Sequence, residues 1–174
     1  MSPFSEHLGK PSVEQEYRRQ WPDLPLRSGA VPYRLAAGGT VEILLIRRSG
    51  QNVWSIPKGQ LSPFNSLVDT AAAEAFEEAG ASGSLGHDPL GSFLHLKSRR
   101  GFLSQPRVVE VVVFPLAVET LALRWPEMGI RERQWFPQDE AQSHVAPGQL
   151  RNILEDFEAQ PEVLVLADRY EMDG

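Results

Sequence analysis

Apolar residues along this chain fall into short runs separated by turn-forming residues, a pattern typical of β-strands. Such runs predict strands at residues 30–36, 41–47, 53–56, 91–97, 107–118 and 131–136. Gly38 and Gly39 lie between the first two runs, so we expect a hairpin with a short Gly-Gly loop. The run at 107–118, RVVEVVVFPLAV, is the richest in β-branched residues and is expected to be a central strand.

A helix is predicted over residues 149–159, because apolar residues recur there at helical spacing. These residues are Leu150, Ile153, Leu154 and Phe157. Strands and helices follow one another without strict alternation, which indicates a mixed sheet between helices. We therefore expect an α/β fold in which helices flank a mixed β-sheet.

A second helix is predicted over residues 67–79. Ser66 is suited to be its N-cap, with Asp69 three residues later in a capping-box arrangement, and Gly80 is suited to end it in a left-handed conformation. The apolar face predicted at 100° per residue consists of Val68, Ala72, Ala75, Phe76 and Ala79.

The chain divides into three parts by composition. Residues 1–27 contain four prolines and are interpreted as an N-terminal extension with a short helix near 13–21. Residues 28–160 form the folded domain. Residues 161–174 are a C-terminal tail that could add an edge strand or pair with another subunit, so a homodimer is one possible assembly.

The overall composition narrows the choice of partners and compartment. The 174 residues are 41% hydrophobic, contain no cysteine and include neither a membrane-length apolar run nor a signal peptide. We therefore expect a cytoplasmic protein without membrane association. The net charge of −6 disfavours nucleic acid as a partner, so a phosphate site must be built from local cations.

Three carboxylates share one face near the end of the second predicted helix. Glu74, Glu77 and Glu78 are spaced i, i+3, i+4, so they repel one another and also oppose the helix dipole. A solvated acidic face is the ordinary explanation of such a pattern. A divalent cation among the three acids would relieve the repulsion, and oxygen ligands suit Mg²⁺ or Mn²⁺.

The residues around these acids favour the metal interpretation. The stretch resembles the Nudix box, G-x5-E-x7-R-E-U-x-E-E-x-G-U, in which U is aliphatic. The matching residues are Gly59, Glu74, Glu77, Glu78, Gly80 and Ala81. Two positions depart from the pattern: Asn65 replaces a glutamate, and Ala73 replaces an arginine that helps to hold the catalytic glutamates in the family.

The resemblance, which covers residues 28–158, implies the α/β/α Nudix sandwich and hydrolysis of a phosphoanhydride. It implies a metal site of Glu74, Glu77, Glu78 and the Gly59 carbonyl, with Glu74 and Glu78 mainly metal ligands and Glu77 a ligand or the base. Many members use a further glutamate on a late strand. Glu132 could take that catalytic role here, although a solvated carboxylate is the favoured alternative.

Weaker motifs point to one branch of the family. SGAVPYR at 28–34, WSIPKG at 54–59 and RERQWF at 131–136 are similar to segments of the diphosphoinositol-polyphosphate and diadenosine-polyphosphate hydrolases. The resemblance therefore implies a phosphorylated small-molecule substrate. Its phosphates would be bound by basic residues. The candidates are Arg34, Arg47, Lys58, Lys97, Arg99, Arg100 and Arg107.

Two alternatives to this function stay open. Ala73 and Asn65 could leave a Nudix-fold binding or sensor module with weak hydrolysis. An RNA 5′-pyrophosphohydrolase is the second alternative, which the negative net charge disfavours.

Overall fold

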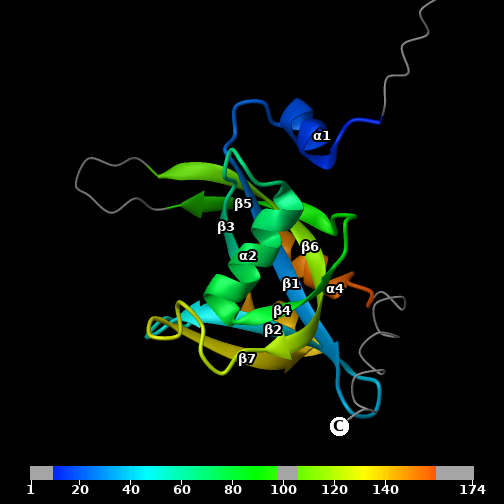
Figure 1. The fold of residues 1–174 in the computed structure, drawn as a ribbon, viewed down its shortest axis with the longest axis vertical. Helices are drawn as coiled ribbons and strands as arrows, with labels where there is room; N and C mark the ends of the chain where they lie inside the picture. The colour runs from blue at the N-terminus through cyan, green and yellow to red at the C-terminus, as the bar shows by residue number, and fades with distance from the viewer. Residues whose placement is uncertain (1–9, 98–105, 160–174) are drawn as a thin grey trace, which may run out of the picture.

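The computed structural model describes residues 10–97 and 106–159, which form a seven-stranded mixed sheet with helices on both faces (Figure 1). The strands are β1 (Leu26–Leu35), β2 (Val41–Arg48), β3 (Lys58–Gln60), β4 (Ala81–Leu85), β5 (Gly91–Lys97), β6 (Arg107–Leu121) and β7 (Arg131–Pro137). The helices in the described part are α1 (Val13–Gln20), α2 (Leu67–Ala79), α3 (Gln138–His144) and α4 (Gly148–Glu155). None of these helices is long and apolar enough to span a membrane.

The sheet runs in the order β4-β6-β1-β2-β7, while β3 pairs with β1 and β5 pairs with β6. Among the described strands, β1 and β6 are the parallel pair, and the other named pairs are antiparallel. The central position of β6 agrees with its β-branched sequence, because both of its faces are covered.

Two hydrophobic cores lie on opposite faces of this sheet. One core packs α3 and α4 through Ala141, Leu150 and Leu154. The other core packs α2 through its alanines, with α1 at its margin. Helices therefore cover both faces, which confirms the predicted α/β/α sandwich with a mixed sheet.

Most predicted strands are present, and two predictions need correction. Residues 53–56 do not form a strand of the sheet: Trp54 and Ser55 each make one isolated bridge, and the chain then passes through Pro57 into β3. The last predicted helix is shorter than expected, since α4 ends at Glu155 rather than at 159. Neither β4 nor α3 was predicted, because β4 (ASGSL) is short and polar and α3 (QDEAQSH) carries only one buried residue, Ala141.

The ends of α2 are as predicted. The side chain of Ser66 accepts a hydrogen bond from the Asp69 backbone, and the Asp69 side chain accepts one in return, which completes the capping box. Gly80 ends the helix at φ 66°, in the left-handed region. Arg133 supplies the cation that the acidic last turn lacks, because it donates to the carbonyls of Ala79 at 2.6 Å and Ala122 at 2.7 Å.

The predicted apolar face of α2 is correct for Ala75 and Ala79, which are buried, and wrong for Ala72 and Phe76. Ala72 and Phe76 are exposed, whereas Leu67, Thr70, Ala71, Ala75, Glu78 and Ala79 are buried. A helix rich in alanine gives little contrast between its faces, so small side chains could face the sheet on either side. The face chosen in the structure includes Glu78, whose charge is compensated by partners from other elements.

Glu110 in β6 is buried beside Ser92 and Tyr17. It is 1% exposed, and Ser92 donates to its Oε1 at 2.8 Å. Burial raises the pKa of Glu110. Burial, and after it the nearby Glu110 carboxylate, raises the pKa of Tyr17 in α1. This carboxyl therefore belongs to the contact between α1 and the sheet.

Candidate active site

Glycine at position 59 lets the Glu74 carboxylate lie directly against the backbone of β3. A Cβ added to Gly59 would be 1.6 Å from Glu74 Oε1 and 1.9 Å from its Cδ. β3 presents this glycine to α2, because Gly59 pairs with Ser28, whose hydroxyl donates to the Leu67 carbonyl at the start of the helix. The box glycine and the first box glutamate, 15 positions apart in sequence, are thus in contact.

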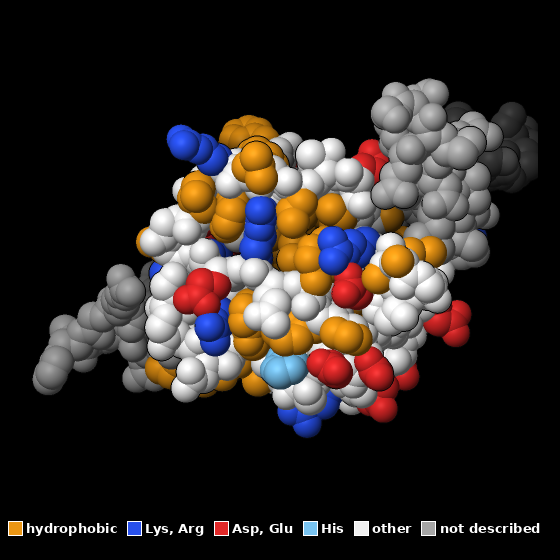
Figure 2. All heavy atoms as spheres, turned by 90° about the horizontal axis from the view of Figure 1, so that it is seen from below, with side chains coloured by type: hydrophobic (Ala, Val, Ile, Leu, Met, Phe, Trp, Pro, Cys, Tyr) orange, Lys and Arg blue, Asp and Glu red, His pale blue; other side chains and the backbone are white. Residues whose placement is uncertain are grey.

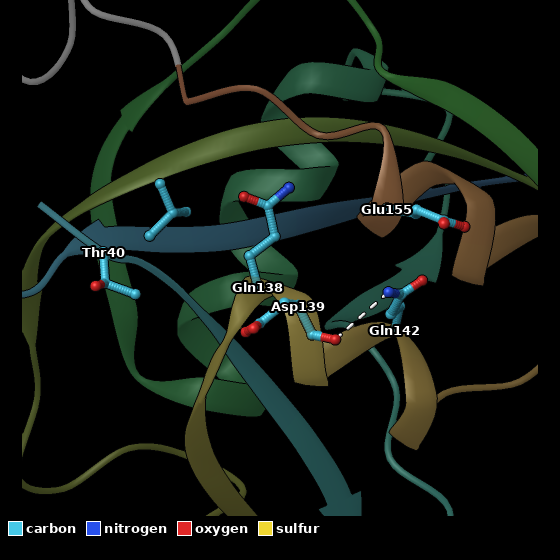
Figure 3. A pocket seen from close by; sticks show the side chains of 6 residues that line it. Thr40, Gln138, Asp139, Gln142 and Glu155 are labelled. Atoms are coloured by element: carbon cyan, nitrogen blue, oxygen red, sulfur yellow. Dashed lines mark hydrogen bonds between the residues drawn. The ribbon is translucent and has the colours of Figure 1, made fainter.

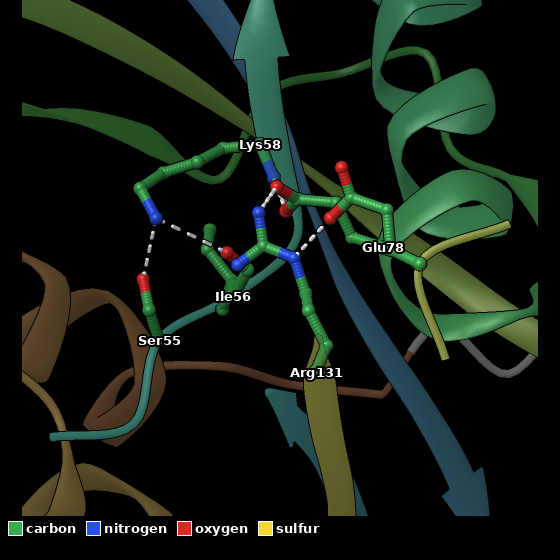
Figure 4. A network of polar contacts seen from close by, with 6 residues as sticks. Ser55, Ile56, Lys58, Glu78 and Arg131 are labelled. Atoms are coloured by element: carbon green, nitrogen blue, oxygen red, sulfur yellow. Dashed lines mark hydrogen bonds and ion pairs between the residues drawn. The ribbon is translucent and has the colours of Figure 1, made fainter. Parts of the chain in front are cut away.

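Glu78 is 6% exposed and has partners from two other elements (Figure 4). Its Oε2 accepts a hydrogen bond from the Lys58 backbone N–H at 3.0 Å. Its Oε1 forms an ion pair with the guanidinium of Arg131 in β7. Arg131 also forms an ion pair with Glu127, in the loop before β7. Sequence reasoning missed both Arg131 and Glu127, because only the sheet pairing brings them to α2.

Burial is the main cause that raises the pKa of two of these carboxyls, Glu74 and Glu78. Burial, followed by repulsion from Glu78, Glu77 and Glu127, raises the pKa of Glu74 to about 7. Burial also raises the pKa of Glu78, while Arg131 and the Lys58 N–H act in the opposite direction. Glu77 is exposed, so it lies at the rim of the site. These carboxylates form a site that is short of positive charge.

The donor set fits a divalent cation. Carboxylate oxygens are the ligands that Mg²⁺ and Mn²⁺ prefer, and the space over Gly59 is kept free of side-chain carbon for the Glu74 carboxylate. Within residues 10–97 and 106–159, no three acidic or histidine side chains already converge as a metal-binding group. In this arrangement Glu78 forms its ion pair with Arg131.

A basic surface adjoins the carboxylates, on the side of β3 opposite to α2. Arg27, Lys58 and Lys97 lie close enough to His95 to lower its pKa to about 4, although burial is the larger cause. Burial also lowers the pKa of Lys58 to about 8, and its Nζ donates to Ser55 Oγ at 2.8 Å. Arg27 acts on Glu74 as well, so this surface reaches the acids. Arg27 and His95 were not predicted from the sequence.

The structure brings only some of the predicted basic residues to this surface. Lys58 and Lys97 lie there, and Arg107 pairs with Lys97 at the ends of β5 and β6. Arg34 instead forms an ion pair with Glu42 at 2.7 Å and stacks on Trp135. Arg99 and Arg100 lie outside the described residues.

Glu132 and Arg47 form a separate pair. Their ion pair measures 2.6 Å, and Arg47 stacks on Trp54. Because neighbouring residues of a strand point to opposite faces, Glu132 points away from the face on which Arg131 contacts Glu78.

The molecular face drawn in Figure 2 also interleaves basic, acidic and apolar side chains rather than presenting a field of one sign.

A hollow lies at the junction of β2, α3 and α4, away from the glutamates of α2 (Figure 3). Thr40, Val41, Gln138, Asp139, Gln142 and Glu155 line it. Gln142 is held there by a hydrogen bond to the Asp139 carbonyl at 3.4 Å. Its lining includes none of the box residues, so it does not extend the acidic site.

Comparison with known proteins agrees with the fold. The NUDIX domain model matches residues 25–157, so the chain belongs to the Nudix family. The chain is 32% identical to Nudix hydrolase 21, chloroplastic, of Arabidopsis thaliana over 133 residues, which cover 74% of this chain and 64% of that relative. It is 28% identical to Nudix hydrolase 13, mitochondrial, of the same plant. The aligned region covers 90% of this chain and 82% of that relative.

Solved structures share the fold at lower identity. A binary complex of the Ap4A hydrolase of C. elegans is 21% identical and has a TM-score of 0.56, with 76% of this chain and 93% of that chain covered. A NUDIX hydrolase from Nitrosomonas europaea is 20% identical and has a TM-score of 0.57. The match covers 76% of this chain and 87% of that chain. At this identity the likeness concerns the fold alone. The chain spans less than two thirds of the length of several of the curated plant relatives.

Proposed function

We propose that this chain is a metal-dependent pyrophosphohydrolase that cleaves a phosphoanhydride in a small molecule carrying several phosphates. A diphosphoinositol polyphosphate or a dinucleoside polyphosphate is the favoured substrate. The observation that supports the proposal is the nearness of the two kinds of charge: Arg27 lies near enough to both Glu74 and His95 to lower the pKa of each.

The cations of the basic surface repel one another, and an anionic substrate would relieve this repulsion. Arg27, Lys58 and Lys97 surround a His95 whose low pKa keeps it neutral at pH 7. Three cations so close together repel one another unless an anion lies among them. A substrate with many phosphates offers that charge, whereas a nucleotide sugar with two phosphates offers less. The neutral imidazole can still donate one hydrogen bond and accept another.

The residues divide into roles by position. Glu74 and Glu78 would hold the Mg²⁺ or Mn²⁺ ion, with the Gly59 carbonyl as a further ligand. When bound, that ion neutralises the phosphate oxygens and the leaving phosphate. Glu77, exposed at the rim, can accept a proton from the attacking water or join the ligands. Arg27 and Lys58 would bind the phosphates of the substrate.

A hydrolysis panel tests the proposal. The substrates are diphosphoinositol polyphosphates, dinucleoside polyphosphates, nucleotide sugars, ADP-ribose and 5′-triphosphorylated RNA, each with Mg²⁺ or Mn²⁺ and with EDTA as the metal-free control. We expect the highest kcat/KM on the first two classes and none with EDTA. Binding of these ligands without turnover would favour the sensor module, and a preference for RNA would overturn the small-molecule assignment.

A pair of arginine variants tests the basic surface. Arg27→Gln should raise KM for the polyphosphates by about tenfold and leave kcat within about twofold, as expected when an interaction is equal in substrate and transition state. Arg124→Gln, an exposed arginine in the loop before β7, is the matched control and should change neither constant. Equal behaviour of the two variants would remove Arg27 from the substrate site.

A further inference from the structure

Arg131 connects the acidic helix to the strand β7. Its side chain is 13% exposed and forms ion pairs with Glu78, which is 8% exposed at its side chain, and with Glu127. The Lys58 N–H donates to the second oxygen of Glu78 at 3.0 Å. The Glu78 carboxylate is therefore held from two sides, by β7 and by β3, before any ion is present.

The loop that carries Glu127 fixes Arg131 relative to the helix. The Glu127 N–H donates to the Glu77 carbonyl at 3.1 Å, so the loop is attached to the last turn of α2. The Arg131 N–H donates in turn to the Glu127 carbonyl at 3.0 Å, which closes the loop on itself. A planar guanidinium can contact two carboxylates at once, which a lysine ammonium does with less geometric control.

The helix itself supplies no such cation. Ala73 occupies the position at which the family pattern has arginine, and its side chain is exposed. The last turn of α2 contains no basic residue. A buried carboxylate without a partner is strongly unfavourable, so Glu78 needs a cation from elsewhere in the fold.

We propose that Arg131 is a positioning residue that holds Glu78 for metal binding, and that it supplies, from its place in β7, the cation that the last turn of α2 lacks. The inference deepens the proposed function, since it takes Glu78 to be a metal ligand. Groups that hold a metal ligand in place typically change affinity or activity about 10- to 100-fold when they are removed.

The first test measures metal binding without substrate. Mn²⁺ binding to Arg131→Met and to wild type is followed by electron paramagnetic resonance, with Arg124→Met as the matched control. We expect Arg131→Met to bind Mn²⁺ at least about tenfold more weakly, and Arg124→Met to bind as wild type does. Unchanged or tighter binding by Arg131→Met would overturn the proposal, because Arg131 would then be neutral or a competitor of the metal.

The same assay works if no substrate of the panel is cleaved, so it separates failure of this inference from failure of the proposed function. If Arg131→Met does not fold, as judged by circular dichroism, Arg131→Lys replaces it. The lysine keeps one charge but not the two-pronged contact, and we expect about a threefold loss of Mn²⁺ affinity. Wild-type affinity in Arg131→Lys would contradict the need for a guanidinium.

The second test uses steady-state kinetics. Arg131→Met should lower kcat by about tenfold and leave KM within about twofold, whereas a phosphate-binding role would raise KM. A rise in KM with kcat unchanged would overturn the positioning role.

Discussion

Replacing Gly59 by alanine should separate folding from catalysis. The three atoms nearest to the new Cβ all belong to the Glu74 carboxyl group, and Oε1 would be only 1.6 Å away. An ordinary contact of this kind is about 3.5 Å, so the carboxylate must move by about 2 Å. No backbone atom is among these contacts, so rotation of the Glu74 side chain can relieve the overlap.

The expected loss follows from that displacement. A shift of about 1 Å in a catalytic group can cost about 100-fold in rate. We therefore expect Gly59→Ala to lose at least about 100-fold in kcat/KM, which corresponds to about 3 kcal/mol of transition-state stabilisation. The free energy of unfolding, from urea denaturation, should change by less than about 1 kcal/mol.

Two further variants make the result decisive. Gly148→Ala is the matched control, because a Cβ there meets nothing within 4 Å, and it should keep full activity. If Gly59→Ala is unstable, adding Glu74→Ala removes the overlapping group and should restore stability. Wild-type activity in Gly59→Ala would refute the reasoning, since the carboxylate over Gly59 would then not be the catalytic one.

Other perturbations test the charges around α2. Glu78→Gln should lower kcat by at least about 1000-fold at saturating Mg²⁺, measured on the best substrate of the panel, because it removes a ligand charge. Arg133→Met should lower the free energy of unfolding by about 2 kcal/mol in urea denaturation, since the carbonyls at the end of α2 lose a charged donor. Ala73→Arg should change it by less than about 0.5 kcal/mol, because position 73 is exposed. The pKa of the Glu74 carboxyl is raised in the folded protein, so protonation of this group favours folding. This stabilisation of the metal-free protein is fully present below pH 4.5 and is lost as the pH rises to about 7. Discounted for partial exposure, that loss is about 1–2 kcal/mol in urea denaturation at pH 5 against pH 8, and Glu74→Gln should remove it.

The sequence alone determined the features of this protein that depend on neighbouring residues. Ser66, Asp69 and Gly80 set the ends of α2 through bonds that span only a few positions, so local rules located the helix correctly. The same holds for the hairpin of β1 and β2, whose Gly38 and Gly39 adopt φ of 93° and 82°. The box spacing was sufficient to place its glutamates on this helix.

The tertiary structure decided which of those glutamates is buried and what surrounds it. Arg131 meets Glu78 across 53 positions of sequence, because the sheet places β7 beside the last turn of α2. Arg27 reaches His95 and Glu74 for a similar reason, since the pairing of β1 with β3 and β6 brings distant segments to one surface. Which face of the alanine-rich α2 is buried was likewise decided by its packing against the sheet. Local periodicity carries no information on such pairings, because the strand register and the packing of the sheet fix them only when the whole chain has folded.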